Sequence, residues 1–228
     1  TETVTTSLLD GGSRVNLSQN IDQPGASGTA VNTQGTAQDD VFSAVIDTDT
    51  DNAANNQTTF NNLDQIQGAG GQDRLELQVL DSNGNDEVLD TFPSAQVAGI
   101  NVLDIRSTVQ LDAIDLSNAN FDAALTDVNL SRADGGTNAA GLTVGDSVNV
   151  TASNVGTDNV LAINGGATQT VDVDEADVSI DLEGTDGDVN VTSADQETTT
   201  GGTEDGNIVI DDGDNVTVTG SLENDTDA

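Results

Sequence analysis

Short runs in which Val, Ile and Leu alternate with polar residues recur along the whole chain. The clearest run is segment 74–79, Arg-Leu-Glu-Leu-Gln-Val. Strict alternation of this kind predicts β-strands with one face in a core and the other in solvent. Clusters of Asp, Asn, Gly and Thr separate the runs at intervals of roughly 8–20 residues, as turns do. The pattern therefore predicts an all-β protein.

The predicted strands are most regular after residue 107. They are the segments 109–111, 113–116, 124–130, 141–151, 160–163, 170–173, 178–182, 189–192, 208–210 and 216–219. Short strands with turns between them fit a β-solenoid, which resembles a β-helix, and they also fit a β-sandwich. Two or three inward apolar residues per strand suit the small core of a solenoid. We place the solenoid first and keep the sandwich as the alternative.

Three parts follow from the changes in pattern along the chain. Residues 1–37 combine a β-prone stretch with loop residues, which predicts an N-terminal arm or an edge strand. Residues 38–106 hold motifs that favour a calcium-binding β module. Residues 107–228 are expected to form the β-solenoid or β-sandwich region.

Composition excludes several classes of function. The chain has 228 residues, with 41 Asp and Glu against four Arg, no Lys and no His, which gives a net charge of −37. Phosphate contacts need a basic surface, so we expect no nucleic-acid partner. Cys and His are both absent, which removes the usual zinc ligands. No apolar run of membrane-spanning length is present, so no membrane span is expected.

Catalysis is not expected either. No Ser has a His or Lys to activate it, because the chain contains neither residue. A glycosidase that uses two carboxylates stays formally possible. Sugar sites usually offer aromatic platforms, however, and the chain has four Phe and no Trp or Tyr. We therefore predict that the protein is not an enzyme.

The acidic residues are mostly the short one, with 33 Asp and 8 Glu. Carboxylates in loops with Asn and Gly suit Ca²⁺, which takes six to eight oxygen ligands. Halophilic adaptation also enriches acidic residues and removes Lys. We expect Ca²⁺ as the cofactor, and the two explanations can coexist.

Segment 38–80 carries the most specific motifs. A pair, Asp39 and Asp40, precedes a strand, and the loop after that strand places Asp47, Asp49 and Asp51 at alternate positions. Next come Thr-Phe-Asn-Asn-Leu-Asp-Gln-Ile at 59–66 and Gly-Ala-Gly-Gly-Gln-Asp at 68–73. A glycine cluster before an Asp predicts a tight turn whose backbone can fold around an ion.

The order of these motifs resembles a module of bacterial surface-layer and type I-secreted calcium-binding proteins, which are related to repeats-in-toxin proteins. The resemblance covers roughly residues 38–106, with Ala69 in place of a Gly and Asn101 in place of the usual Glu. It implies Asp40, Asp64 and Asp73 as the first choices for Ca²⁺ ligands. Asp39 and Asp47 are the second choices, and Asp49 and Asp51 complete the candidate set from the loop.

These observations lead to one functional expectation and one alternative. We expect an extracellular structural protein of a bacterial cell surface or biofilm matrix that binds calcium and self-assembles into a filament, an S-layer or a matrix. Its partners would be copies of itself and cell-surface polysaccharide. The alternative is an adhesin, or a glycan- or ice-binding β module of a secreted protein.

Overall fold

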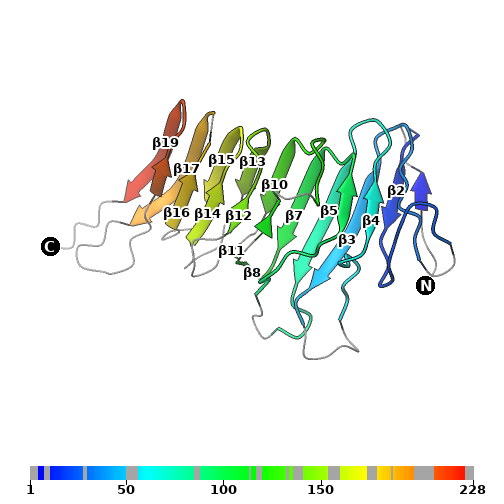
Figure 1. The fold of residues 1–228 in the computed structure, drawn as a ribbon. Helices are drawn as coiled ribbons and strands as arrows, with labels where there is room; N and C mark the ends of the chain where they lie inside the picture. Colours follow the sequence, from blue (N-terminus) through cyan, green and yellow to red (C-terminus); the bar gives the residue numbers. More distant parts are fainter. Residues whose placement is uncertain are drawn as a thin grey trace.

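The computed structural model is an elongated stack of β-coils whose strands follow one another along the stack in chain order (Figure 1). The structure describes residues 5–7, 11–27, 30–49, 56–84, 88–112, 114–116, 120–131, 134–135, 141–153, 160–173, 179–185, 187–197 and 208–223. This part of the chain contains strands and turns and no helix, so it also holds no helix able to span a membrane.

One long sheet takes a strand from each successive coil. Its order is β1, β2, β3, β5, β7, β10, β13, β15, β17 and β19. The neighbours are parallel, except that β1 runs antiparallel to β2. In that order the strands are Thr5–Ser7, Ser13–Asn16, Val41–Asp47, Arg74–Leu80, Val102–Ser107, Asp127–Ser131, Asn149–Ser153, Thr168–Val173, Val189–Glu197 and Val216–Glu223.

Shorter parallel sheets form the other sides of the coils. A five-stranded sheet has the order β18, β16, β14, β12 and β9, and two pairs join β4 to β6 and β8 to β11. Their bounds, from β4 upward, are Gln65–Gln67, Gln96–Ala98, Gln110–Leu111, Ile114–Asp115, Asp134–Gly135, Leu142–Thr143, Val160–Asn164, Ser179–Glu183 and Ile208–Asp211. Parallel neighbours require a crossover, and here each crossover completes one coil.

This arrangement is a β-solenoid. The all-β prediction is confirmed, and of the two architectures left open it is the solenoid that the chain adopts. A sandwich would pair its strands mainly in antiparallel hairpins, whereas β1 and β2 are the one antiparallel pair among the described strands.

Stacking in register places equivalent side chains above one another in the core. One inward column of the main sheet holds Phe42, Leu75, Leu103, Val128 and Val150, each at most 1% exposed. Beside the main sheet three aromatic rings also stack, with centroids 5.6 Å apart for Phe60–Phe92 and 6.3 Å apart for Phe92–Phe121. The apolar core is continuous from Val15 to Val191.

The coils shorten along the stack from β3 to β15, whereas the last described coil, from Val189 to its partner Val216, spans 27 residues. The coil from Val41 to its partner Arg74 spans 33 residues. The next four, which start at Arg74, Val102, Asp127 and Asn149, span 28, 25, 22 and 19 residues. The main sheet runs without a break across both expected part boundaries, at 37/38 and 106/107. The division of the chain into these three parts stays a prediction.

Candidate functional site

Asp40 and Asp73, two of the acidic residues that the sequence singled out, lie where strands of the main sheet begin. Register places Ser13, Asp40, Asp73 and Asn101 in one row on successive coils. The N–H of Ser13 donates to Asp40 Oδ1 at 2.6 Å, and the N–H of Asp40 donates to Asp73 Oδ1 at 2.8 Å. The N–H of Asp73 donates in turn to Asn101 Oδ1 at 2.9 Å. We call these four residues the Asx ladder.

Asp40 is fully buried, and uncharged donors surround it. Its Oδ1 also accepts the Ser13 hydroxyl at 2.7 Å, and its Oδ2 accepts the Thr36 N–H at 2.5 Å. The Thr36 hydroxyl lies 3.1 Å from both oxygens. Since a carboxylate offers about four acceptor sites, Asp40 has no free lone pair for a metal ion. It fastens Ser13 and Thr36 to the beginning of β3.

Asp73 occupies the next position and is 1% exposed. Burial raises the pKa of its carboxyl group, and the charges of Asp40 and Asp39 raise it further, although the N–H groups of Asp40 and Ala69 oppose the rise. Its Oδ2 accepts no hydrogen bond of good geometry and lies where a Cβ at position 68 would collide with it. This oxygen is the least satisfied acceptor of the ladder.

Asp64 belongs to a second arrangement, with Asp22 as its neighbour on the previous coil. The N–H of Asp22 donates to Asp64 Oδ1 at 2.9 Å, and the N–H of Asn61 donates to Asp64 Oδ2 at 2.6 Å. The N–H groups of Ser18 and Val31 donate to Asp22, both at 2.6 Å. Burial raises the pKa of Asp64, with a smaller contribution from the charge of Asp22.

The loop candidates lie at the opposite end of β3. Asp47 accepts the N–H groups of Gln57 at 2.8 Å, Ser82 at 3.1 Å and Asp49 at 3.2 Å. Burial alone would raise the pKa of Asp47, but these donors outweigh it and lower the pKa. Asp49 is fully buried beside Ser82. Asp51 lies outside the described residues.

The seven candidates thus fall into separate places. The structure brings Asp40 and Asp73 into contact and puts the exposed Asp39 near them, while Asp64 and the loop pair lie elsewhere. No group of three acidic residues in the described part of the chain is placed to share a metal ion. The buried carboxylates act there as acceptors for backbone N–H groups. They do not form an oxygen cage in the described residues, and calcium binding stays a prediction.

The glycine segment packs coil against coil. The N–H of Gly68 donates to the Ala98 carbonyl at 2.8 Å, and a Cβ on Gly99 would lie 2.8 Å from the Gly68 carbonyl oxygen. Gly71 has a φ of 96°, and a Cβ there would lie 2.6 Å from Asp39 Oδ1. Only glycine permits these approaches.

Sequence reasoning missed Asp22 and Asn101 as members of these networks. A signal for Asp22 was present, because Asn-Ile-Asp-Gln at 20–23 matches Asn-Leu-Asp-Gln at 62–65. The hydrogen bond from Asp22 to Asp64 joins the two copies on neighbouring coils. The copies lie 42 residues apart, so a search for short repeats without a fixed spacing would have paired Asp22 with Asp64.

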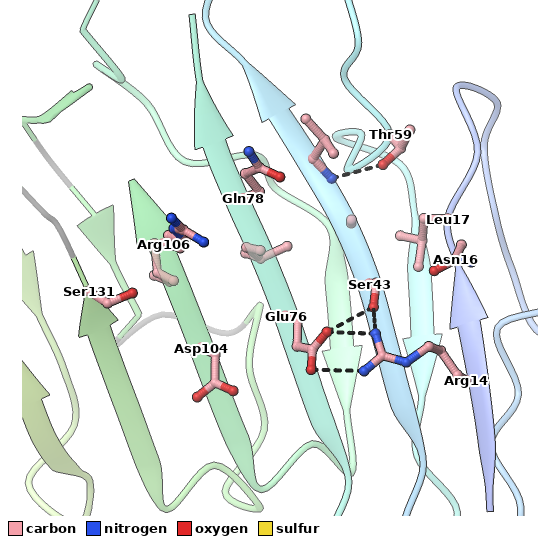
Figure 2. A pocket seen from close by; sticks show the side chains of 14 residues that line it. Arg14, Asn16, Leu17, Ser43, Thr59, Glu76, Gln78, Asp104, Arg106 and Ser131 are labelled. Atoms are coloured by element: carbon pink, nitrogen blue, oxygen red, sulfur yellow. Dashed lines mark hydrogen bonds and ion pairs between the residues drawn. The ribbon is translucent and has the colours of Figure 1, made fainter. Parts of the chain in front are cut away.

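A second candidate site is a groove of about 540 Å³ over the outer faces of β2, β3, β5 and β7 (Figure 2). Arg14 donates two hydrogen bonds to Glu76, at 2.7 and 3.1 Å, and another to Ser43 at 2.7 Å. The bond to Arg14 lowers the pKa of Glu76, and the same bond raises the pKa of Arg14. Arg74 pairs with Asp104.

Arg106 differs from these two arginines. It lines the groove, is exposed, and forms no ion pair with any residue that the structure describes. Register places Gln78 on β5 and Ser131 on β10 at its two sides (Figure 2). The row therefore presents a guanidinium, an amide and a hydroxyl to solvent.

A third candidate lies at the last described coil. Val216 and Val218 of β19 continue the inward columns of Val189 and Val191, which are at most 1% exposed. Val216 and Val218 are themselves 49% and 51% exposed. β19 is the last strand of the main sheet, so its outer edge has no strand partner among the described residues.

No protein-family model, curated protein or solved structure matches this chain.

Proposed function

We propose that the chain is an extracellular structural module whose solenoid associates with copies of itself, coil against coil, in a cation-dependent way. The observation that carries the proposal is the edge of β19. Its inward residues Val216 and Val218 are half exposed, whereas the equivalent residues of every earlier described coil are buried. Another strand along this edge would bury both side chains and satisfy the backbone groups of β19.

Charge makes such association dependent on ions. Arg132 is the last basic residue, and 21 Asp and Glu follow it. Two like ends would repel each other, because this part of the chain has no side chain to compensate its carboxylates. Cations from the medium would have to reduce the repulsion between copies.

We propose Ca²⁺ as the principal cation, because it prefers oxygen ligands and Asp exceeds Glu four to one. The resemblance of residues 38–106 to surface-layer and type I-secreted proteins supports a bacterial cell surface or matrix as the location. Among the predicted ligands, Asp73 and Asp39 fit best, because Asp73 Oδ2 accepts no hydrogen bond of good geometry and Asp39 is exposed nearby. Asp40 fits least, since its acceptors are filled.

Sedimentation velocity with 5–10 mM Ca²⁺, roughly the range that saturates weak extracellular sites, and with excess chelator at the same ionic strength tests the proposal. We expect large species with Ca²⁺ and monomers with chelator. Val216→Asn with Val218→Asn should remove the large species. The matched control, Thr217→Asn with Thr219→Asn, changes the outer face of the same strand and should assemble normally. Monomers under both conditions, or assembly by the valine variant, would contradict the proposal.

An adhesive function is the second candidate, and one observation favours it. The outer face of the last coils presents an exposed row of neutral hydrogen-bonding side chains in register, Thr151, Thr170, Asn190 and Thr217. Such a flat, regular row suits a periodic partner such as a glycan fibre or ice. Co-sedimentation with insoluble polysaccharide, or an assay of ice growth, should respond to Thr170→Glu if this function holds.

A further inference from the structure

We propose that the groove over β2, β3, β5 and β7 binds an acidic polysaccharide, with the guanidinium of Arg106 pairing with a uronate carboxylate. Nothing in this inference requires the chain to assemble with copies of itself. It concerns a face of the sheet that is separate from the edge of β19.

Arg106 is the available cation of the groove. Arg14 is already bound to Glu76 and Arg74 to Asp104, so the two acids closest in register to Arg106 are occupied. Asp104 also accepts a hydrogen bond from the Asn129 side chain at 2.7 Å. A planar guanidinium matches a carboxylate with two parallel hydrogen bonds, and Arg106 has no such partner among the described residues.

Local charge favours an anion here in spite of the overall charge. The groove is lined by two arginines, Arg14 and Arg106, and two acids, Glu76 and Asp104, so its charges balance, whereas the whole chain has a net charge of −37. Glu76 pairs with Arg14 and Asp104 with Arg74, which leaves the guanidinium of Arg106 for an anion. Salt screens charges beyond about 8–10 Å at ordinary ionic strength. A carboxylate in the groove therefore interacts mainly with Arg106.

The other lining residues favour a sugar over a small anion. Asn16, Ser43, Thr59, Gln78 and Ser131 supply neutral amides and hydroxyls. These groups can bond the hydroxyls of a saccharide chain while Arg106 holds its acid group. A volume of about 540 Å³ lies within the usual range for ligand sites.

Isothermal titration of the full chain with oligogalacturonate, in chelator and about 0.15 M NaCl so that the overall charge is screened, tests the inference. The fully methyl-esterified oligosaccharide is the neutral control. We expect the free acid to bind, with an affinity that falls as NaCl rises, and the ester not to bind. Equal binding of both ligands, or binding of neither, would overturn the inference.

Arg106→Gln should weaken binding by about tenfold, the effect of losing one charge-assisted pair. The affinity of Arg106→Lys should lie between those of the wild type and Arg106→Gln. Lysine keeps the positive charge but cannot form the two parallel hydrogen bonds of a guanidinium. The matched control is Arg106→Gln with Thr192→Arg, which restores the net charge at an exposed position in the same outer row, four coils away. Restored binding in this double variant would contradict a specific site. If Arg106→Gln instead changes sedimentation and no ligand binds, Arg106 contacts a second copy and the polysaccharide inference is wrong.

Discussion

The coils up to β7 and those from β13 onward share one sheet, yet they place their acidic residues in opposite ways. The early coils bury six acidic side chains, Asp22, Asp40, Asp47, Asp49, Asp64 and Asp73. From β13 onward no acidic side chain in the described residues is buried. The early coils also contain the aromatic stack of Phe60, Phe92 and Phe121.

This difference shows that the acidic residues have different roles in the two regions of the chain. In the early coils, carboxylates replace backbone acceptors where strands begin and so join one coil to the next. In the late coils, most described carboxylates face solvent, Asp181 with its buried Oδ1 being an exception, and no basic side chain follows Arg132 to compensate them. The first group affects stability directly, and the second affects how the protein responds to ions and to its own copies.

The largest expected effect comes from breaking the Asx ladder. Asp40→Ala removes the buried carboxylate that accepts the N–H groups of Ser13 and Thr36, and a hydrogen bond to a charged group contributes about 1.5–3 kcal/mol. We therefore expect the free energy of unfolding to fall by about 3 kcal/mol or more. Asp172→Ala, at an exposed position of β15, should change it by less than about 0.5 kcal/mol. Urea unfolding measures the free energy of unfolding of both variants. Equal losses of stability would contradict the proposed difference between the early and late acidic residues.

The pH dependence of the free energy of unfolding should be an effect of intermediate size. The raised pKa values of Asp64 and Asp73 mean that the folded state takes up protons before the unfolded state does. Stability should rise as the pH falls through those raised values, down to about 3.9, the ordinary pKa of Asp. At lower pH it should fall, because Asp47 and Glu76 have lowered pKa values and lose their stabilising ionised form.

Asp73→Asn tests how much of this pH dependence of stability comes from the Asx ladder. Asn101 already fills the next ladder position with an amide, and Asn at position 73 can still accept the Asp40 N–H. We expect this variant to be more stable than the wild type at pH 7 and to gain less on acidification. Urea midpoints at pH 7 and pH 5 provide the measurement. A midpoint at pH 7 below that of the wild type would contradict the assignment.

The smallest expected effect concerns the ion pairs on the outer face. Arg14→Gln removes a bidentate pair whose two side chains are each 38% exposed. Solvent screens such a pair, so the free energy of unfolding should fall by at most about 1 kcal/mol. Arg106→Gln, which breaks no ion pair among the described residues, should leave it unchanged. Thermal unfolding of both variants measures these changes in stability. A larger loss of stability in Arg106→Gln than in Arg14→Gln would contradict the prediction.

Strand content could be predicted well from the sequence because alternation is a local signal. Arg74–Leu80 and Ile208–Asp211 lie close to where the pattern placed them. The predicted strand 141–151 was wrong in extent, since the chain turns at Asp146 and Ser147 between β12 and β13. Apolar residues continue through that corner because both sides of a coil face the same core.

The roles of the acidic residues could not be predicted in the same way. An Asp before a strand suits a calcium ligand and a backbone acceptor equally, because both roles require a short carboxylate in a turn. The distinction depends on which N–H groups lie opposite, as Ser13 does for Asp40, 27 positions away. Such pairing is set by coil length, which local patterns do not encode.

The half-exposed inward face of β19 has a consequence for folding order. In a stack where each coil contacts mainly its neighbours, stability is a sum of local terms. The early coils contain the packed aromatic rings, so folding should nucleate there and proceed toward β19. The coil that ends in β19 has a neighbouring coil on one side only among the described residues, so it should fray first. A second molecule that docks on β19 would then cover the coil that forms last. Under the proposed self-association, the addition of each subunit would complete the folding of the one before it.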